Sequence, residues 1–308
     1  MRRALLLFVA LVAVATPVVI PITAAHAATV AADVDPYRGL GSWVDSFDYA
    51  PRLQSNGNPP PVTAASVDDM ARLGVRTLYV QVANPDGVSP DQLTDEVQLR
   101  EILTHARTSG LKVVAWYLPG LADVALDTRM IKTIVAFRSG TARFDTVALD
   151  LEYTQGETDV TVRNANAVEV ARNTRKLLGT KRAIGAIVYP AVQTEVLNPV
   201  LWPNFPYKKL AESVDVWMPM AYYTFRSDPY RDPFRYTDES VARLRKRLDN
   251  DNALVHPIGG IADQTTPEDY GAFLRAVKST KAIGYSVYDF NTTSSSAWTF
   301  LRGSGLPT

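Results

Sequence analysis

Two carboxylates stand at the end of a strand-like run near the middle of the chain. Asp150 and Glu152 end the apolar, β-branched stretch 145–153. Because side chains alternate faces along a strand, these two residues project to the same side. When two acids share an enclosed site, their proton affinities are pushed apart, so that one can stay protonated while the other is charged. The spacing therefore predicts an acid pair for proton transfer, provided that the strand ends at the mouth of a cavity.

The elements that position this pair alternate regularly along the chain. Strands are expected at residues 39–47, 75–83, 112–118, 146–153, 183–189, 215–223, 254–261 and 282–290. Helices are expected at residues 64–73, 91–108, 123–137, 160–178, 207–213, 239–248, 267–278 and 295–301. Eight such units predict an α/β fold, a single (β/α)8 TIM barrel over residues 38–303, followed by a short tail, 304–308. A doubly wound open sheet would need a glycine-rich phosphate loop after its first strand, but Gly39 and Gly41 precede Trp43 within it.

The carboxyl ends of the predicted strands define the candidate site, because they form the active-site face of a TIM barrel. Substrate-binding side chains are expected at Trp43, Asp45, Gln81, Trp116, Tyr117, Tyr189, Met220, Tyr288 and Asp289. Tyr222 shares strand parity with Met220 and is expected to point into the lumen beside the acid pair. Aromatic faces stack on sugar rings, while carboxylates and amides bind hydroxyl groups. The rim therefore favours a carbohydrate ligand.

With these residues in place, the chain resembles the glycoside hydrolase family 18 chitinase group. That family carries Asp-Gly-x-Asp-x-Asp-x-Glu on its fourth strand, and its first Asp, last Asp and Glu fall on Asp145, Asp150 and Glu152. Its sixth-strand Met-x-Tyr-Asp motif falls on Met220 and Tyr222. The resemblance implies a chitinase-like barrel of unassigned family, with a sugar bound at the carboxyl ends of the strands.

The chain departs from the family pattern at several positions. Ala148 stands where the family has its middle Asp, Tyr223 stands where the sixth-strand motif ends in Asp, and Tyr288 is the counterpart of a Trp. The Ser-x-Gly-Gly of the third strand is replaced by the sequence that begins at Trp116. These replacements leave a second interpretation open, a carbohydrate-binding barrel without catalysis.

In the catalytic interpretation, Glu152 protonates the leaving glycosidic oxygen, with its pKa raised by an enclosed site and by Asp150. If the sugar carries an acetamide, Asp150 and Tyr222 orient that group as the nucleophile. If it does not, a second carboxylate must attack or activate water, and Asp45 or Asp289 would supply it. Asp145 is expected at the opposite end of the barrel with a structural role.

The N-terminal sequence predicts export. Arg2 and Arg3 precede an apolar run to about residue 22, and Ala25-His26-Ala27 forms a cleavage signal. Residues 1–27 are thus expected to be a signal peptide cleaved near Ala27, with residues 28–37 a short linker and the mature chain secreted. An uncleaved membrane anchor is the alternative.

Composition narrows the classes of function. Without Arg2 and Arg3, the chain carries 30 basic and 32 acidic side chains, which gives no reason to expect a nucleic acid or a membrane surface as partner. There is no cysteine, and the three histidines are scattered, which disfavours thiol chemistry, a Ser-His-Asp triad and a histidine-rich zinc site. We therefore expect a monomer that acts on a polysaccharide or oligosaccharide without a metal or cofactor.

Overall fold

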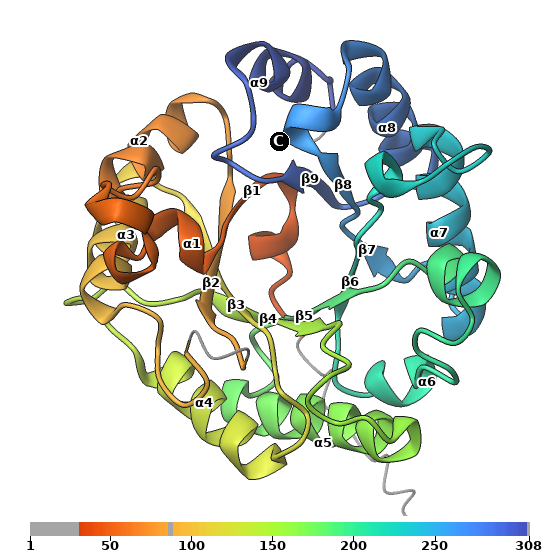
Figure 1. Cartoon of the computed structure of the whole chain (residues 1–308), viewed down its shortest axis with the longest axis horizontal. Coiled ribbons are helices and arrows are strands. Elements are labelled where there is room, and N and C mark those ends of the chain that lie inside the picture. The colour runs from red at the N-terminus through yellow and green to blue at the C-terminus, as the bar shows by residue number, and fades with distance from the viewer. Residues whose placement is uncertain (1–30, 86–88, 307–308) are drawn as a thin grey trace, which may run out of the picture. The chain divides into compact units, whose positions relative to one another are not determined.

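The computed structural model describes residues 31–85 and 89–306. The predicted signal peptide, residues 28–30 of the expected linker and the last two residues of the tail lie outside these ranges. Figure 1 shows an inner ring of strands surrounded by an outer ring of helices. The strands are β1 (Gly39–Val44), β2 (Thr77–Ala83), β3 (Lys112–Tyr117), β4 (Thr146–Leu151), β5 (Ile184–Val188), β6 (Val216–Pro219), β7 (Leu254–Val255), β8 (Ile258–Ile261) and β9 (Gly284–Tyr288).

These strands form one parallel sheet in the order β7-β6-β5-β4-β3-β2-β1-β9-β8. β7 and β8 together occupy the predicted seventh strand, which is interrupted because Pro257 has no N–H to donate. β7 pairs with β6 and β8 pairs with β9, while Met220 forms a parallel bridge with Ile258. The segment from Leu254 to Ile261 thus joins the two sides of the sheet, and the predicted TIM-barrel-like α/β fold is confirmed.

The helices follow the predicted pattern with three main differences, one additional helix and two changed starts. They are α1 (Ser46–Tyr49), α2 (Ala64–Arg72), α3 (Glu96–Ser109), α4 (Val124–Ala136), α5 (Val160–Leu178), α6 (Tyr207–Leu210), α7 (Pro233–Leu248), α8 (Pro267–Ser279) and α9 (Ser295–Arg302). α1 replaces the predicted end of the first strand because the Asp45 carboxylate accepts hydrogen bonds from the backbone N–H groups of Phe47 and Asp48. α3 begins at Glu96 and not at residue 91, because Asp95 caps it. α7 begins earlier than predicted because Asp232 caps it and Pro233 occupies its first position. Within the described ranges, no helix is long and apolar enough to cross a membrane.

The floor of the barrel is formed by the segment that precedes β1. Residues 31–37 were expected to be a linker, but they include a short 3-10 helix, η1 (Asp35–Tyr37), and Tyr37 is completely buried. The Tyr37 hydroxyl donates to the Val147 carbonyl at 2.8 Å and accepts from the Gly185 N–H at 2.7 Å. This side chain therefore connects the chain before β1 to β4 and β5 on the opposite side of the ring.

A hydrogen-bonded chain above this floor determines the state of His256. His256 Nδ1 lies 2.9 Å from the Tyr37 carbonyl oxygen, which can only accept, so this nitrogen carries the proton. Nε2 then accepts from the Ser286 hydroxyl at 3.0 Å, and Ser286 in turn accepts from Trp43 Nε1 at 2.8 Å. Burial lowers the pKa of His256 to about 4. The imidazole is therefore neutral in the folded protein at neutral pH.

His256 is expected to make the folded state acid-sensitive. Between pH 6.5 and 4 the unfolded chain binds a proton that the folded chain does not, so this group removes about 3 kcal/mol of stability as the pH falls. Urea unfolding across this range should show a smaller loss for His256→Asn, which keeps a donor toward Tyr37. Buried acids with raised pKa values act in the opposite direction, but they are common to both proteins. Identical pH dependence in the two proteins would contradict the assignment.

Candidate active site

A cavity of about 250 Å³ opens at the carboxyl ends of the strands, and we call it the central cavity. Its lining side chains are Trp43, Trp116, Asp150, Glu152, Ile187, Met220, Tyr222, Phe225, Ile258, Ile261 and Tyr288. The structure thus brings Asp150, Glu152, Met220 and Tyr222 together, as strand parity predicts. Apart from the two acids and the tyrosine hydroxyl groups, the walls are largely apolar.

Asp150 is the more deeply buried of the two acids, with 1% of its surface exposed. Its Oδ2 accepts from Trp116 Nε1 at 2.7 Å, whereas its Oδ1 has no hydrogen-bond partner among the described residues. Burial raises the pKa of Asp150 well above its usual range, and the charge of Glu152 raises it further, while the Trp116 N–H opposes both. A buried carboxylate oxygen without a partner is costly, so Oδ1 is available to a ligand that donates an N–H or O–H.

Glu152 follows β4 and is half-buried at the wall of the cavity. Burial raises the pKa of its carboxyl group as well. Since ionisation of each acid hinders ionisation of the other, the pair holds a proton at a pH where an isolated carboxyl group would have lost it. The two acids can therefore provide one proton donor and one negative charge to the same ligand.

The position of the Trp116 indole depends on the small side chain across from it. Trp116 pairs with Ala148 in the register between β3 and β4. Ala148 is completely buried in the lumen, two residues before Asp150. A methyl group at this position leaves room for the indole to reach Asp150. Trp116 is thus the side chain that hydrogen-bonds Asp150 across the sheet.

Tyr222, Tyr288 and Phe225 form the aromatic part of the wall. The rings of Tyr222 and Tyr288 have centroids 6.2 Å apart, and Phe225 meets Tyr222 edge-on at 6.1 Å. Burial raises the pKa of the Tyr222 hydroxyl, and the charges of Glu152 and Asp150 add to the shift. The hydroxyl therefore remains protonated at neutral pH and can donate to a ligand.

An acidic cluster lies behind Tyr288, at the ends of β1 and β9. Carboxylate oxygens of Asp45, Asp48 and Asp289 all lie within 4.8 Å of one another, and Asp45 Oδ2 accepts from the Tyr288 hydroxyl at 2.7 Å. Burial, followed by the charges of Asp45 and Asp289, raises the pKa of Asp48 to about 7. Asp45 also caps α1, and Asp289 Oδ1 accepts from the N–H and hydroxyl of Thr292. The cluster has the donor atoms for a cation, but local hydrogen bonds engage each of its members.

Besides Asp45 and Asp289 of the acidic cluster, three more of the predicted substrate-binding residues lie outside the wall of the central cavity. Tyr117 lies between the sheet and α4, where its hydroxyl donates to Asp127 Oδ1 at 2.6 Å, so its predicted place on the cavity is wrong. The amide oxygen of Gln81 accepts from the Ser46 N–H at 3.2 Å and is not at the cavity wall. Tyr189 is half-buried, and its hydroxyl donates to the backbone carbonyl of Glu152 at 3.2 Å. Tyr189 therefore contacts the acid's backbone and not the cavity.

Several residues of the site were not predicted. Phe225, Ile187, Ile258 and Ile261 line the central cavity, and Asp48 belongs to the acidic cluster. Parity along β5 and β8 could have indicated Ile187 and Ile258, whereas Ile261 follows an irregularity in the register of β8. The spacing of Asp45 and Asp48 is that of a helix-capping pair. Phe225 ends a 3-10 turn, η5 (Tyr223–Phe225), where strand parity gives no guide.

No lysine or arginine is among the described residues that line the central cavity. The nearby loop 224–236 is rich in arginine, but its guanidinium groups are engaged within the loop or by neighbouring helices. Arg226 donates to the Tyr236 hydroxyl at 3.2 Å, and Arg231 makes two hydrogen bonds to Asp269 of α8. Arg235 lies 3.9 Å from Glu239 within α7. The cavity thus offers negative charge and hydrogen-bonding groups, without a cation for an anionic ligand.

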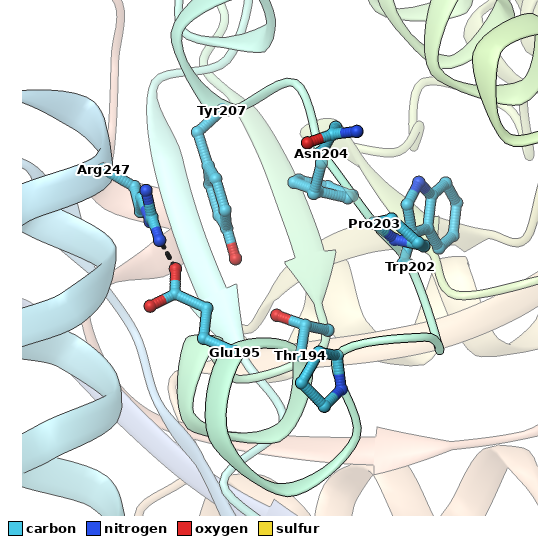
Figure 2. Close-up of a pocket in the computed structure, with 9 residues that line it drawn as sticks. Thr194, Glu195, Trp202, Pro203, Asn204, Tyr207 and Arg247 are labelled. Carbon is cyan, nitrogen blue, oxygen red and sulfur yellow. Dashed lines mark hydrogen bonds and ion pairs between the residues drawn. The ribbon is translucent and has the colours of Figure 1, made fainter.

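A separate hollow of about 350 Å³ lies between the segment 194–205 and the end of α7 (Figure 2). Figure 2 shows Arg247 directed at Glu195, which also accepts from Arg243 at 3.4 Å. Trp202 is buried, and its Nε1 donates to Asn164 at 2.6 Å. The charged groups of this hollow are paired and the Trp202 indole N–H has its own acceptor, so the central cavity is the better candidate for chemistry.

The sequence itself matches no protein-family model and no curated protein. The structure, in contrast, is similar to solved structures. The Bacillus cereus spore cortex-lytic enzyme SleL superposes with a TM-score of 0.62 at 9% identity, covering 87% of this chain and 74% of that one. The Cycas revoluta GH18 chitinase in complex with (GlcNAc)3 gives 0.59 at 12% identity, covering 86% and 99%. The chitinase-like agglutinin from Robinia pseudoacacia gives 0.60 at 13% identity, also covering 86% and 99%.

These neighbours define the class of fold. The barrel is that of the GH18 chitinases and chitinase-like proteins, with the family unassigned, in agreement with the resemblance seen in the sequence. Since the class includes both enzymes and an agglutinin, the fold alone does not decide between catalysis and binding.

Proposed function

We propose that this protein is a secreted glycoside hydrolase that cleaves a polysaccharide containing N-acetylated amino sugars. The observation that carries the proposal is the paired acids in an enclosed aromatic cavity, with Asp150 Oδ1 unpartnered within the described chain. An acetamide N–H is a donor of the kind this oxygen lacks. GlcNAc oligomers occupy the similar barrel of the Cycas revoluta chitinase, which supports the same ligand class here.

In the proposed reaction, Glu152 donates its proton to the glycosidic oxygen as the bond from that oxygen to C1 breaks. The sugar's own acetamide oxygen attacks C1, so no protein nucleophile is required. Asp150 accepts the acetamide N–H through Oδ1 and stabilises the positive charge that develops on this group, while the Tyr222 hydroxyl helps to orient it. Water then attacks C1, releases the acetamide and returns a proton to Glu152.

The proton distribution in the free site is compatible with this sequence of steps. Without a ligand, burial disfavours the charge on Asp150 more than on the half-buried Glu152. A bound acetamide N–H stabilises charged Asp150, which favours placing the shared proton on Glu152. Substrate binding would thereby place the proton where the leaving oxygen needs it.

The charge of the site indicates which sugars it would accept. Asp150 and Glu152 are the lining groups of the central cavity that can carry charge at neutral pH, and both are acids. Three more acids lie behind Tyr288. An anionic sugar would be repelled without a compensating cation. We therefore propose a neutral glycan such as chitin and not a polymer of uronic acids.

Export is proposed from the N-terminal sequence alone. Arg2 and Arg3, the apolar run and the site at Ala27 have the form of a cleavable signal. N-terminal sequencing of protein recovered from the medium of expressing cells would test it. A mature N-terminus near residue 28 is expected, and intact Met1 would contradict cleavage.

The experiment that tests the proposed function is reducing-sugar release by the mature protein from chitin, peptidoglycan and plain glucans. Release from an N-acetylated polymer would support the hydrolase. Binding without release would favour a carbohydrate-binding barrel, which is supported by the replaced acids at Ala148 and Tyr223 and by the likeness to an agglutinin. If the protein neither bound nor cleaved any of these polymers, both functions would be contradicted.

The Trp116 N–H is expected to control the acid limb of the pH–rate profile. Trp116→Phe keeps a ring in the wall but removes the donor to Asp150, so the pKa of this acid should rise further. Because the proposed reaction needs Asp150 charged, the acid limb should move to higher pH, and kcat should fall about tenfold at its former optimum.

The matched control is Trp202→Phe, which removes an indole N–H from Asn164 outside the central cavity. It should cost comparable stability and leave the pH profile in place. An unchanged acid limb in Trp116→Phe would show that this hydrogen bond does not set the charge on Asp150.

A further inference from the structure

A second hollow, which we call the side cavity, adjoins the central cavity. It has a volume of about 300 Å³ and is lined by Gln193, Leu197, Phe225, Arg226, Ser227, Asp228, Pro229 and Tyr230. These residues come from the loops that follow β5 and β6, at the same end of the barrel as the acid pair. Phe225 lines both cavities, so the two hollows are neighbours.

Phe225 is unusually exposed for a residue of a cavity wall. Its edge-on contact with Tyr222 orients the ring, yet 56% of its surface remains accessible. Leu197, which also lines the side cavity, is exposed as well. An oriented aromatic ring with an open face offers an apolar platform on which the C–H face of a sugar ring can stack.

The lining of the side cavity also includes an unmet hydrogen-bonding group. Gln193 begins a π-helical turn, η4 (Gln193–Leu197), closed by a hydrogen bond from the Asn198 N–H to the Gln193 carbonyl at 2.8 Å. The Gln193 side-chain oxygen is buried, and the described part of the chain supplies it with no donor. π-helical turns occur frequently at functional sites, and an unpaired buried acceptor gains most from a ligand that brings a donor.

The charges around the side cavity favour a neutral ligand. The Arg226 guanidinium lies 5.6 Å from the centre of the Tyr236 ring and donates to its hydroxyl, so its hydrogen-bonding capacity is directed away. An apolar platform and an amide acceptor remain, with the Ser227 hydroxyl and the Asp228 carboxylate at the margin. This combination fits the alternating C–H and O–H faces of an uncharged sugar.

We propose that the side cavity is a second sugar subsite, in which Phe225 stacks on a ring and Gln193 Oε1 accepts a hydroxyl or acetamide hydrogen. The inference rests on the proposed function, because its occupant is the next part of the glycan chain held in the central cavity. A glycan that reaches both cavities passes over Phe225. The natural substrate is therefore longer than the sugar unit that the central cavity holds, and affinity rises with chain length.

The test is binding of GlcNAc oligomers from dimer to hexamer to full-length Glu152→Gln protein, measured by calorimetry without turnover. We expect the hexamer to bind about tenfold more tightly than the dimer when Phe225 and Gln193 are intact. Adding Phe225→Ala should remove most of this gain, so that in this variant the hexamer binds little more tightly than the dimer. Adding Gln193→Met, which keeps the length but removes the acceptor, should weaken hexamer binding about fivefold.

The control is Phe300→Ala, which removes another exposed phenylalanine from α9, far from both cavities in sequence and packed on Tyr270. It should leave the length dependence unchanged. Retention of the full length dependence in both Phe225→Ala and Gln193→Met would overturn the subsite.

Hydrolysis of the same oligomers by the wild-type protein separates this inference from the proposed function. Turnover with no dependence of affinity on length would keep the hydrolase and overturn the subsite. Length-dependent binding that is lost in Phe225→Ala, without any turnover, would keep the subsite and overturn the hydrolase. Absence of both binding and turnover would overturn both.

Discussion

Replacing Glu152 by Gln is expected to lower the rate of glycoside hydrolysis about 10³-fold while oligosaccharide binding is retained. The amide has nearly the same shape as the protonated carboxyl group, so the cavity should keep its form. It has no proton that can be transferred to the leaving oxygen, however, and one carboxylate oxygen of Asp150 already accepts the Trp116 N–H. The measurement is kcat on a soluble oligomer of GlcNAc, with binding determined on the same preparation.

The matched control is Glu169→Gln, which makes the same change at an exposed position of α5. It should leave kcat unchanged. If Glu152→Gln kept a tenth or more of the wild-type rate, another group would have to be the acid, and Asp45 or Asp289 would be tested next. If both binding and hydrolysis were lost, a folding defect would have to be excluded by the unfolding midpoint before kcat was interpreted.

The largest expected effect on stability is at Gly284, at the point where β9 meets β1. A Cβ here would lie 2.2 Å from the Tyr37 carbonyl oxygen and 2.3 Å from His256 Nδ1, far inside van der Waals contact. Gly284 also pairs with Gly39, so the strand cannot move aside without opening the sheet. Gly284→Ala should therefore lower the free energy of unfolding by about 3 kcal/mol or more.

Gly271→Ala provides the opposite case. Gly271 lies inside α8, where an added Cβ would be 3.6 Å from the nearest atom, which belongs to the flexible Arg275 side chain. This substitution should raise stability by about 0.5–1 kcal/mol, because alanine favours the helix. Denaturant unfolding of the two variants beside the wild type is the measurement. Equal effects would contradict the steric explanation for Gly284.

The fold could be predicted from the sequence because its signals are local and repeated. Each strand is an apolar, β-branched run, and each long helix has its own periodic apolar face. The element bounds were wrong where a short capping signal competes with a longer apolar pattern. Asp45 and Asp48 end the first strand early by starting α1, and Asp232 with Pro233 starts α7 before its apolar pattern is evident. Both signals were present in the sequence and were outweighed by the longer pattern.

The candidate site could be predicted only where strand parity applies. Asp150 follows the alternation of β4 into the lumen, and Met220 and Tyr222 keep the parity of β6 beyond its end at Pro219. The same rule would have excluded Tyr117, because it is adjacent to Trp116 and must point to the other face. Phe225 could not be derived in this way, since its direction is set by a 3-10 turn and by packing against Tyr222.

The interruption of the seventh strand determines which wall of the central cavity can be displaced. β4, which precedes Glu152, is paired at four positions with β3 and at five with β5. The segment that carries Ile258 is joined to β6 by only two paired positions before Pro257 and one bridge after it. Because few ladder hydrogen bonds hold this segment to β6, its free energy of local opening is lower than that of β4. Amide exchange should therefore be faster in the segment that carries Ile258 than in β4. A ligand would then be accommodated by displacement of the Met220 and Ile258 wall, while the carboxylates opposite keep their positions.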